Sequence, residues 1–165
     1  MFDRLFTKFT KTSETVVIGA DYEARSSGAS TIEAEHILLA LAGQGKSDVA
    51  KALAEVGLGP EEVRTALARE FESSLVGVGA SSTGLDLPDV PPRPRSPRWG
   101  ASAKRALERA VKIAEARGER RVLPAHLLLG VLAAEVGTVR RALAVAGVST
   151  SDLTERTEAL LTSDV

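Results

Sequence analysis

Glu33 and His36 have the types and spacing that could bind a metal. The Glu-x-x-His pattern supplies metal ligands from one face of a helix in di-iron bundles. The chain has only two histidines and no cysteine, so a closed zinc site would depend largely on carboxylates. Leu123 stands where a repeat of the pattern around the second histidine, His126, would need its glutamate. We therefore predict no metal site, and we interpret His36 as a histidine packed at the start of a helix.

The tripeptide Gly45–Lys46–Ser47 could be the end of a phosphate-binding loop. Such a loop needs a glycine five residues earlier, where this chain has Ala40, and it should follow a strand rather than a helix. The chain also lacks the Gly-x-Ser-x-Gly pattern of a hydrolase nucleophile, and neither histidine has a recognisable triad context. The sequence thus predicts no cofactor and no enzyme activity.

Arg105, Arg109 and Lys112 share one face of an expected helix and could contact an acidic partner. They belong to segment 91–121, which holds ten basic and three acidic residues. Such a segment can attract nucleic acid or an acidic protein. However, Glu108 can pair with Lys112 at i, i+4, and the chain has few aromatic residues for base stacking. We favour a solvated helix face, and keep nucleic-acid or acidic-partner binding through 91–121 as the alternative function.

The elements that position these residues occur twice. His36 aligns with His126 at a shift of 90 residues (126 − 36 = 90), and Ala20, Gly28 and Gly57 then align with Ala110, Gly118 and Gly147. A fixed internal period of this kind indicates a duplicated structural unit.

Each copy has four apolar stripes at helical spacing, whereas no segment alternates as a strand would. We predict an all-α fold of eight helices, a tandem repeat of two four-helix units with pseudo-two-fold symmetry. Val63, Leu67 and Phe71 form the expected inner face of the fourth helix. The predicted boundaries are 1–73 for the first repeat, 74–98 for an extended and exposed Pro/Gly-rich linker, and 99–165 for the second repeat.

The composition and the amino-terminal residues indicate where in the cell the protein is expected. Without cysteine the chain cannot form disulfides, and its apolar runs are far shorter than the roughly 18 residues of a membrane span. The amino terminus, MFDRLFTKFTK, is interrupted by charges and does not resemble a secretion signal. We expect a cytoplasmic protein that does not enter a membrane.

The repeated segments resemble the amino-terminal domain of the Clp unfoldases, and most closely that of the ClpC type. The resemblance is carried by Phe9 and Thr10 and by five longer segments: VVIGADYEAR (16–25), AEHILLAL (34–41), VAKALAEVGL (49–58), AHLLLGVL (125–132) and VRRALAVAGV (139–148). It implies a non-catalytic module that docks adaptors or substrates of a Clp protease. It also implies a free-standing adaptor, a decoy, or a copy that sequesters Clp-targeting antibacterial cyclic peptides, with Phe2 as a possible apolar contact.

The resemblance to ClpC-type domains further implies a phosphoarginine site. Thr10 would offer its hydroxyl and a helix amino terminus to the phosphate, and Glu35 would pair with the guanidinium. The residues 90 positions further on are Gly100 and Ala125, which lack the hydroxyl and the carboxylate. The resemblance therefore predicts at most one such pocket, formed by Thr10 and Glu35.

Overall fold

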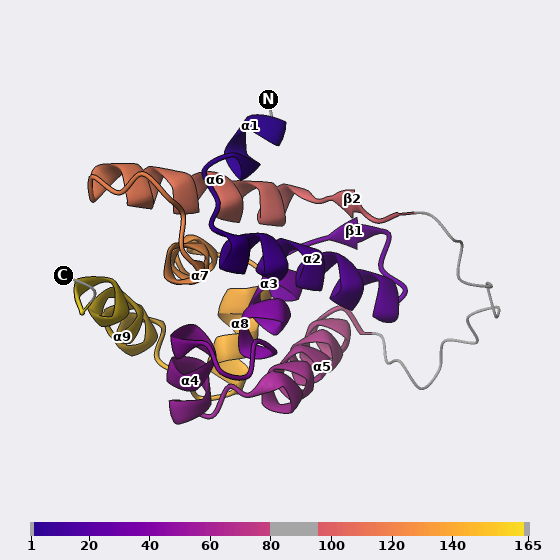
Figure 1. Ribbon diagram of the computed structural model, residues 1–165. Helices are drawn as coiled ribbons and strands as arrows, with labels where there is room; N and C mark the ends of the chain where they lie inside the picture. Colours follow the sequence, from indigo (N-terminus) through magenta and orange to yellow (C-terminus); the bar gives the residue numbers. More distant parts are fainter. Residues whose placement is uncertain (1, 80–95, 164–165) are drawn as a thin grey trace.

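The computed structural model describes residues 2–79 and 96–163, and Figure 1 shows its helices arranged around a common centre. The elements in chain order are α1 (Asp3–Phe6), α2 (Lys11–Ser26), β1 (Thr31–Ile32), α3 (Ala34–Ala42), α4 (Asp48–Glu55), α5 (Pro60–Gly77), β2 (Arg98–Trp99), α6 (Ala101–Ala116), α7 (Pro124–Leu132), α8 (Thr138–Val145) and α9 (Thr150–Thr162). The all-α prediction is confirmed, with α1 as a short helix that the sequence did not indicate.

The predicted duplication is visible in the helix bounds. Adding 90 to the bounds of α2, α3 and α4 gives the bounds of α6, α7 and α8, and the start of α5 maps in the same way onto the start of α9. The two four-helix units therefore have the same helix order, and their first three helices have the same lengths, whereas α5 with 18 residues is longer than α9 with 13.

Local sequence fixes where these helices begin and end. Thr10, Ser47 and Ser149 each accept a backbone N–H from the third residue of the following helix, which satisfies one of its free donors. Helices α4 and α8 are followed by Gly57 and Gly147, whose φ angles of 78° and 71° favour glycine.

The core is built on the second helix of each unit. Eight of the nine residues of α3 are buried, and α7 is equally enclosed. These helices pack against each other and, respectively, against α2 and α6. One continuous apolar cluster contains residues of both units, so the two repeats share a single core.

The outer helices pack across the repeat boundary. Helix α5 of the first unit lies against α8 of the second, and α4 of the first lies against α9 of the second. In Figure 1, α5 and α8 and also α4 and α9 are adjacent, although α4 and α5 are purple to magenta and α8 and α9 are orange to yellow. The units are thus interlocked rather than placed end to end.

Our expectation of no strands was wrong at one point. Thr31 and Ile32 pair in parallel with Arg98 and Trp99, and an isolated bridge joins Phe9 to Val122. The two junctions are equivalent under the 90-residue shift, which carries Phe9 to Trp99 and Ile32 to Val122. Two-residue strands are too short to show any alternation of apolar and polar residues, so they could not be predicted from a sequence pattern.

Two other expectations about the fourth helix and the linker also differ from the structure. Phe71, predicted on the inner face of α5, is 56% exposed, because the buried positions of α5 are Val63, Ala66 and Glu70 and Phe71 lies beside this stripe. Residues 74–77 of the predicted linker belong to α5, and Pro97 is buried beside β2 rather than exposed. Residues 80–95 of the linker lie outside the described part of the chain.

Candidate functional site

Two cavities lie at equivalent places between the repeats. The first, of about 320 Å³, combines the start of α3 with α6 and the start of α8. The second, of about 260 Å³, combines the start of α7 with α2 and the start of α4. The 90-residue shift carries Thr12, Ser47 and Val49 of the second cavity onto Ser102, Gly137 and Val139 of the first.

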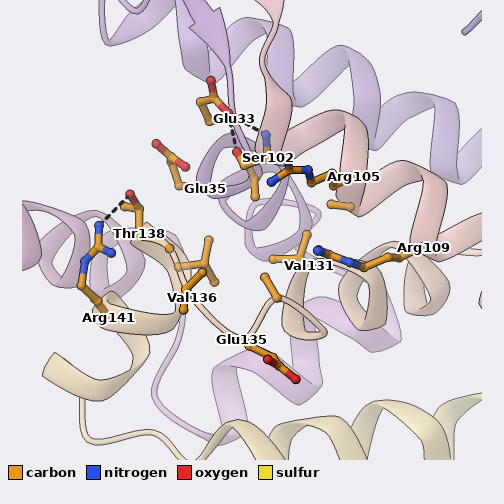
Figure 2. Close-up of a pocket in the computed structure, with 15 residues that line it drawn as sticks. Glu33, Glu35, Ser102, Arg105, Arg109, Val131, Glu135, Val136, Thr138 and Arg141 are labelled. Carbon is orange, nitrogen blue, oxygen red and sulfur yellow. Dashed lines mark hydrogen bonds between the residues drawn. The ribbon is translucent and has the colours of Figure 1, made fainter.

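The two cavities differ in chemistry. In the second, Leu123, Pro124 and Ala125 stand where the first has Glu33, Ala34 and Glu35. Leu160 and Leu161 also line the second cavity, and its charged lining residues are Lys46 and Asp48, beside the start of α4. The first cavity has charged side chains on several sides, so we call it the charged pocket (Figure 2).

Glu33 is held at one edge of the charged pocket. Its carboxylate accepts hydrogen bonds from the backbone N–H and the hydroxyl of Ser102, in the first turn of α6. Helix α6 has Gly100 as its N-cap residue and therefore no capping side chain of its own. A Cβ at residue 100 would meet the Glu33 carboxylate, so glycine at this position leaves room for a cap supplied by the other repeat.

Glu35 is the half-buried acid of the pocket. Burial raises the pKa of its carboxyl above the ordinary value, and the nearby Glu33 and Glu70 act in the same direction. Glu70 behaves differently: burial opposes its ionisation, but hydrogen bonds from Ser74 and Arg141 lower its pKa below the ordinary value. The Nε of Arg141 lies 2.7 Å from Glu70, so this arginine is already paired within the domain.

Arg105 and Arg109 form the basic side of the pocket. Figure 2 shows both side chains extending from α6 toward the same opening, with Glu35 on the other side. None of the ion pairs among the described residues involves either arginine. Lys112 is exposed on the same helix but does not line the pocket. Two of the three predicted basic residues therefore face a cavity rather than an open helix surface.

The structure does not bring Thr10 and Glu35 into one pocket. The backbone N–H of Thr10 donates to the carbonyl of Val122, in the second repeat, whereas Glu35 lines the charged pocket with Ser102 and Arg105. The start of each repeat's first helix meets the other repeat's His-containing segment. The two residues consequently belong to different junctions, and a site made of this pair is not formed.

Phe2, predicted as a possible apolar contact, is half-buried. Its ring lies 5.2 Å from that of Phe6 and 5.5 Å from that of Trp99, measured between centroids. It joins an aromatic cluster over the junction of β2 with the amino terminus, and only part of the ring remains available to a partner.

Both histidines have structural hydrogen bonds. The Nδ1 atoms of His36 and His126 accept the backbone N–H of Glu33 and Leu123, which precede α3 and α7. Burial lowers the pKa of both imidazoles below the ordinary value. His36 is therefore packed at the start of a helix, as predicted, and its Nδ1 already accepts a hydrogen bond. Nε2 of His126 lies 3.3 Å from Glu119 without hydrogen-bond geometry.

The other motif singled out from the sequence also has a structural role. Ser47 of the Gly45–Lys46–Ser47 tripeptide caps α4, and the segment follows a helix. Within residues 2–79 and 96–163, no group of three or more potential ligand side chains is arranged to hold a metal ion. The same ranges contain no helix long and apolar enough to cross a bilayer.

Comparison with known proteins decides the family. Residues 8–90 and 98–164 match the Clp repeat (R) N-terminal domain. The chain belongs to this Clp N-terminal domain family. The two matched ranges correspond to the two repeats.

Relatives and solved structures agree with this assignment. The domain is 31% identical over 160 residues to the negative regulator of genetic competence ClpC/MecB of Bacillus subtilis (strain 168), covering 97% of this chain and 18% of that protein. It is 30% identical over 149 residues to the chloroplastic chaperone ClpC1 of Arabidopsis thaliana, covering 90% of this chain and 14% of that protein. The chain therefore spans less than a fifth of these relatives.

The fold also matches solved Clp domains. The N-terminal domain of ClpD from Arabidopsis thaliana superposes with a TM-score of 0.71 at 20% identity, covering 95% of this chain and 96% of that one. The Hsp104 N-terminal domain from Candida albicans gives a TM-score of 0.63 at 18% identity, covering 93% and 91%. The Clp N-terminal domain fold therefore extends over nearly the whole chain.

Sequence reasoning missed the residues that complete the charged pocket. Ser102, Val131, Thr138 and Arg141 come from three helices of the second repeat, far from Glu35 in sequence. The 90-residue period aligns equivalent positions but does not indicate which repeat supplies each wall. No signal in a single sequence identified these residues.

Proposed function

We propose that this Clp N-terminal domain is a non-catalytic docking module that receives adaptor or substrate polypeptides of a Clp protease. The charged pocket between the repeats is the observation that supports this function most directly. It presents arginines and a half-buried carboxylate to solvent around an apolar floor, whereas the described histidines have structural hydrogen bonds. Such a surface can bind and orient a polypeptide without reacting with it.

The test is an affinity purification with the domain as bait, followed by mass spectrometry. We expect identified Clp ATPases, adaptors or degradation substrates to be retained by the wild type. A bait with Glu35→Lys and Arg105→Glu should lose them, because both sides of the charged pocket are reversed. Glu14→Gln, in the exposed first turn of α2, is the matched control. Absence of every Clp-related protein from the wild-type sample would exclude this function.

A docked polypeptide could carry phosphoarginine, which would bind in the charged pocket through a different set of residues from the Thr10 and Glu35 pair. Glu35 would pair with the guanidinium, and Arg105 and Arg109 would take the part proposed for Thr10 and bind the phosphate. Isothermal titration with a phosphoarginine peptide distinguishes the two arrangements. Glu35→Ala should abolish binding in either arrangement, while Thr10→Asn, which keeps a helix cap but removes the hydroxyl, should bind like the wild type if the arginines hold the phosphate and more weakly if Thr10 does. Undiminished binding by Glu35→Ala would eliminate the proposed role of this carboxylate.

The other roles follow from the same docking function. As a free copy, the domain would act as an adaptor, or as a decoy that competes with an unfoldase's own domain. Sequestration of cyclic peptides would use the exposed part of Phe2 and its aromatic neighbours, and it predicts a rise in melting temperature when such a compound is added. An unchanged melting temperature would argue against sequestration.

Nucleic-acid binding remains the alternative from another class. Arg105, Arg109 and Lys112 support it by their charge, and it requires affinity that decreases steeply as salt rises. Salt-independent binding of an oligonucleotide would exclude it.

A further inference from the structure

A larger cavity adjoins the charged pocket. It has a volume of about 500 Å³, lies between α2, α3 and α5, and shares Glu35 and Thr138 with the charged pocket. Its apolar wall is formed by Leu39, Leu67 and Phe71, and more than half of the Phe71 surface is exposed. We call this cavity the aromatic groove.

The pocket and the groove offer different chemistry to one ligand. Arg105 and Arg109 provide cationic donors at one end, and Phe71 with Leu67 provides an apolar surface at the other. Glu35 lies between them, on the boundary of both cavities. An extended chain advances about 3.3 Å per residue, so two side chains three residues apart are separated by roughly 10 Å. A short polypeptide segment therefore has the length scale needed to use two adjoining cavities.

Charge favours a polypeptide over a nucleic acid here. The aromatic groove is bordered by Glu23, Glu35 and Glu70, of which Glu23 is paired with Arg64 and Glu70 with Arg141. A nucleic acid carries a phosphate at every nucleotide and would bring a second negative charge toward these carboxylates. A polypeptide can place one carboxylate at the arginines and a neutral side chain in the groove.

From these contacts we propose that the charged pocket and the aromatic groove together bind one extended polypeptide segment in which an acidic residue lies a few positions from a large apolar residue. Arg105 and Arg109 hold the carboxylate, and Leu39, Leu67 and Phe71 receive the apolar side chain. This inference rests on the proposed docking function and specifies its ligand.

The repeat predicts a single site of this kind. Thr15 and Gly19 occupy the positions equivalent to Arg105 and Arg109, so the first-repeat helix cannot present the same pair of cations. The corresponding cavity is lined by Leu123, Pro124 and Ala125. Binding should therefore have a stoichiometry of one peptide per domain.

The experiment uses end-capped nonapeptides of Gly and Ser that carry one Asp and one Phe, with one, two or three residues between them. Each is titrated into the ¹⁵N-labelled domain and followed by NMR chemical shifts. We expect at least one spacing to bind, with the largest shifts in α6 and α5 and with affinity that falls as salt rises. Arg105→Gln combined with Arg109→Gln should weaken binding at least tenfold, and Phe71→Ala should weaken it independently. Lys104→Gln, an exposed neighbour on α6, is the matched control.

A double-mutant cycle between the peptide and the domain tests whether the peptide carboxylate contacts the two arginines. Asp→Asn in the peptide should cost as much as removing the two arginine charges, and applying both changes should cost little more than one. Equal binding of the Asp and Asn peptides, two peptides bound per domain, or tighter binding of an eight-nucleotide oligothymidine would overturn the proposal. The double glutamine variant also serves as bait in the affinity purification. If the peptides do not bind but both baits retain the same Clp proteins, the ligand assignment fails while the docking function stands.

Discussion

At Gly130, α7 lies too close to the backbone of α6 to leave room for a Cβ, and Gly130→Ala tests whether that approach is required. A Cβ at residue 130 would lie 2.2 Å from the carbonyl oxygen of Ala106 and 3.0 Å from the amide nitrogen of Ala110. Both obstacles are backbone atoms, so no side-chain rotation can relieve them. Restoring an ordinary contact of 3.4 Å requires the helices to separate by about 1.2 Å (3.4 − 2.2) if the carbonyl is approached directly.

The expected cost follows from two opposing effects. Overpacking a core by one methyl group costs about 1–3 kcal/mol, and alanine recovers about 1 kcal/mol of helix propensity relative to glycine. Because the clash is with a rigid backbone, we expect the upper end of this balance, a net loss of about 2 kcal/mol. For a chain of this size that corresponds to a melting temperature lower by about 4–8 °C.

Thermal and urea unfolding followed by circular dichroism would measure this loss. Two other glycines provide matched controls. A Cβ at Gly77 has nothing within 4 Å, so Gly77→Ala should leave stability unchanged or slightly raised. A Cβ at Gly19 would lie 3.0 Å from the Cβ of Ala40, and Gly19→Ala should fall between the other two. If Gly130→Ala unfolds at the same temperature as Gly77→Ala, the close approach of α6 and α7 is not a constraint on this fold.

Two further predictions concern charge. Arg141→Ala removes a hydrogen-bond donor from the buried carboxylate of Glu70 and should lower the unfolding free energy, measured by urea titration, by about 1–2 kcal/mol. The loss is limited because Ser74 remains as a donor to the same carboxylate. Arg140→Ala, at an exposed neighbouring position, should cause no comparable loss, and equal losses for the two variants would contradict the role of the Arg141–Glu70 pair. Burial lowers the pKa of His126 in the folded state, so the unfolded chain binds more protons as the pH falls through 6.5, and stability that is complete above pH 6.5 declines below it. His126→Gln keeps an acceptor for the Leu123 N–H but does not titrate, so urea midpoints at pH 7.5 and 5.5 should differ less for this variant than for the wild type; an unchanged difference would show that His126 does not cause the decline.

The helices and their repeat could be predicted because they depend on local sequence. Thr10, Ser47 and Ser149 cap helices through hydrogen bonds to residues three positions away, and the apolar stripes repeat with the helical period. The apolar stripe of α5 predicted the burial of Val63 but not the rest of the buried face. Ala66 and Glu70 are the other buried positions of α5, so Phe71 lies beside the buried face and is exposed.

The site could be predicted only in part because its walls come from both repeats. Glu35, Arg105 and Arg109 were each identified from the sequence, but Glu35 was joined to Thr10 instead of to the arginines. The period of 90 residues predicts the same helices in each unit, whether the outer helices pack on their own unit or on the other one. The crossed packing of α5 on α8 and of α4 on α9 depends on tertiary contacts that no local pattern encodes.

The crossed packing has a consequence for a chain that is cut. Each repeat's outer helices pack against the other repeat's core. A break between residues 79 and 96 would therefore leave two fragments that stay associated and keep the charged pocket intact. Either fragment alone would expose the apolar side of its outer helices to water. Proteolytic cleavage between the repeats would then leave docking intact, while loss of one fragment would abolish it.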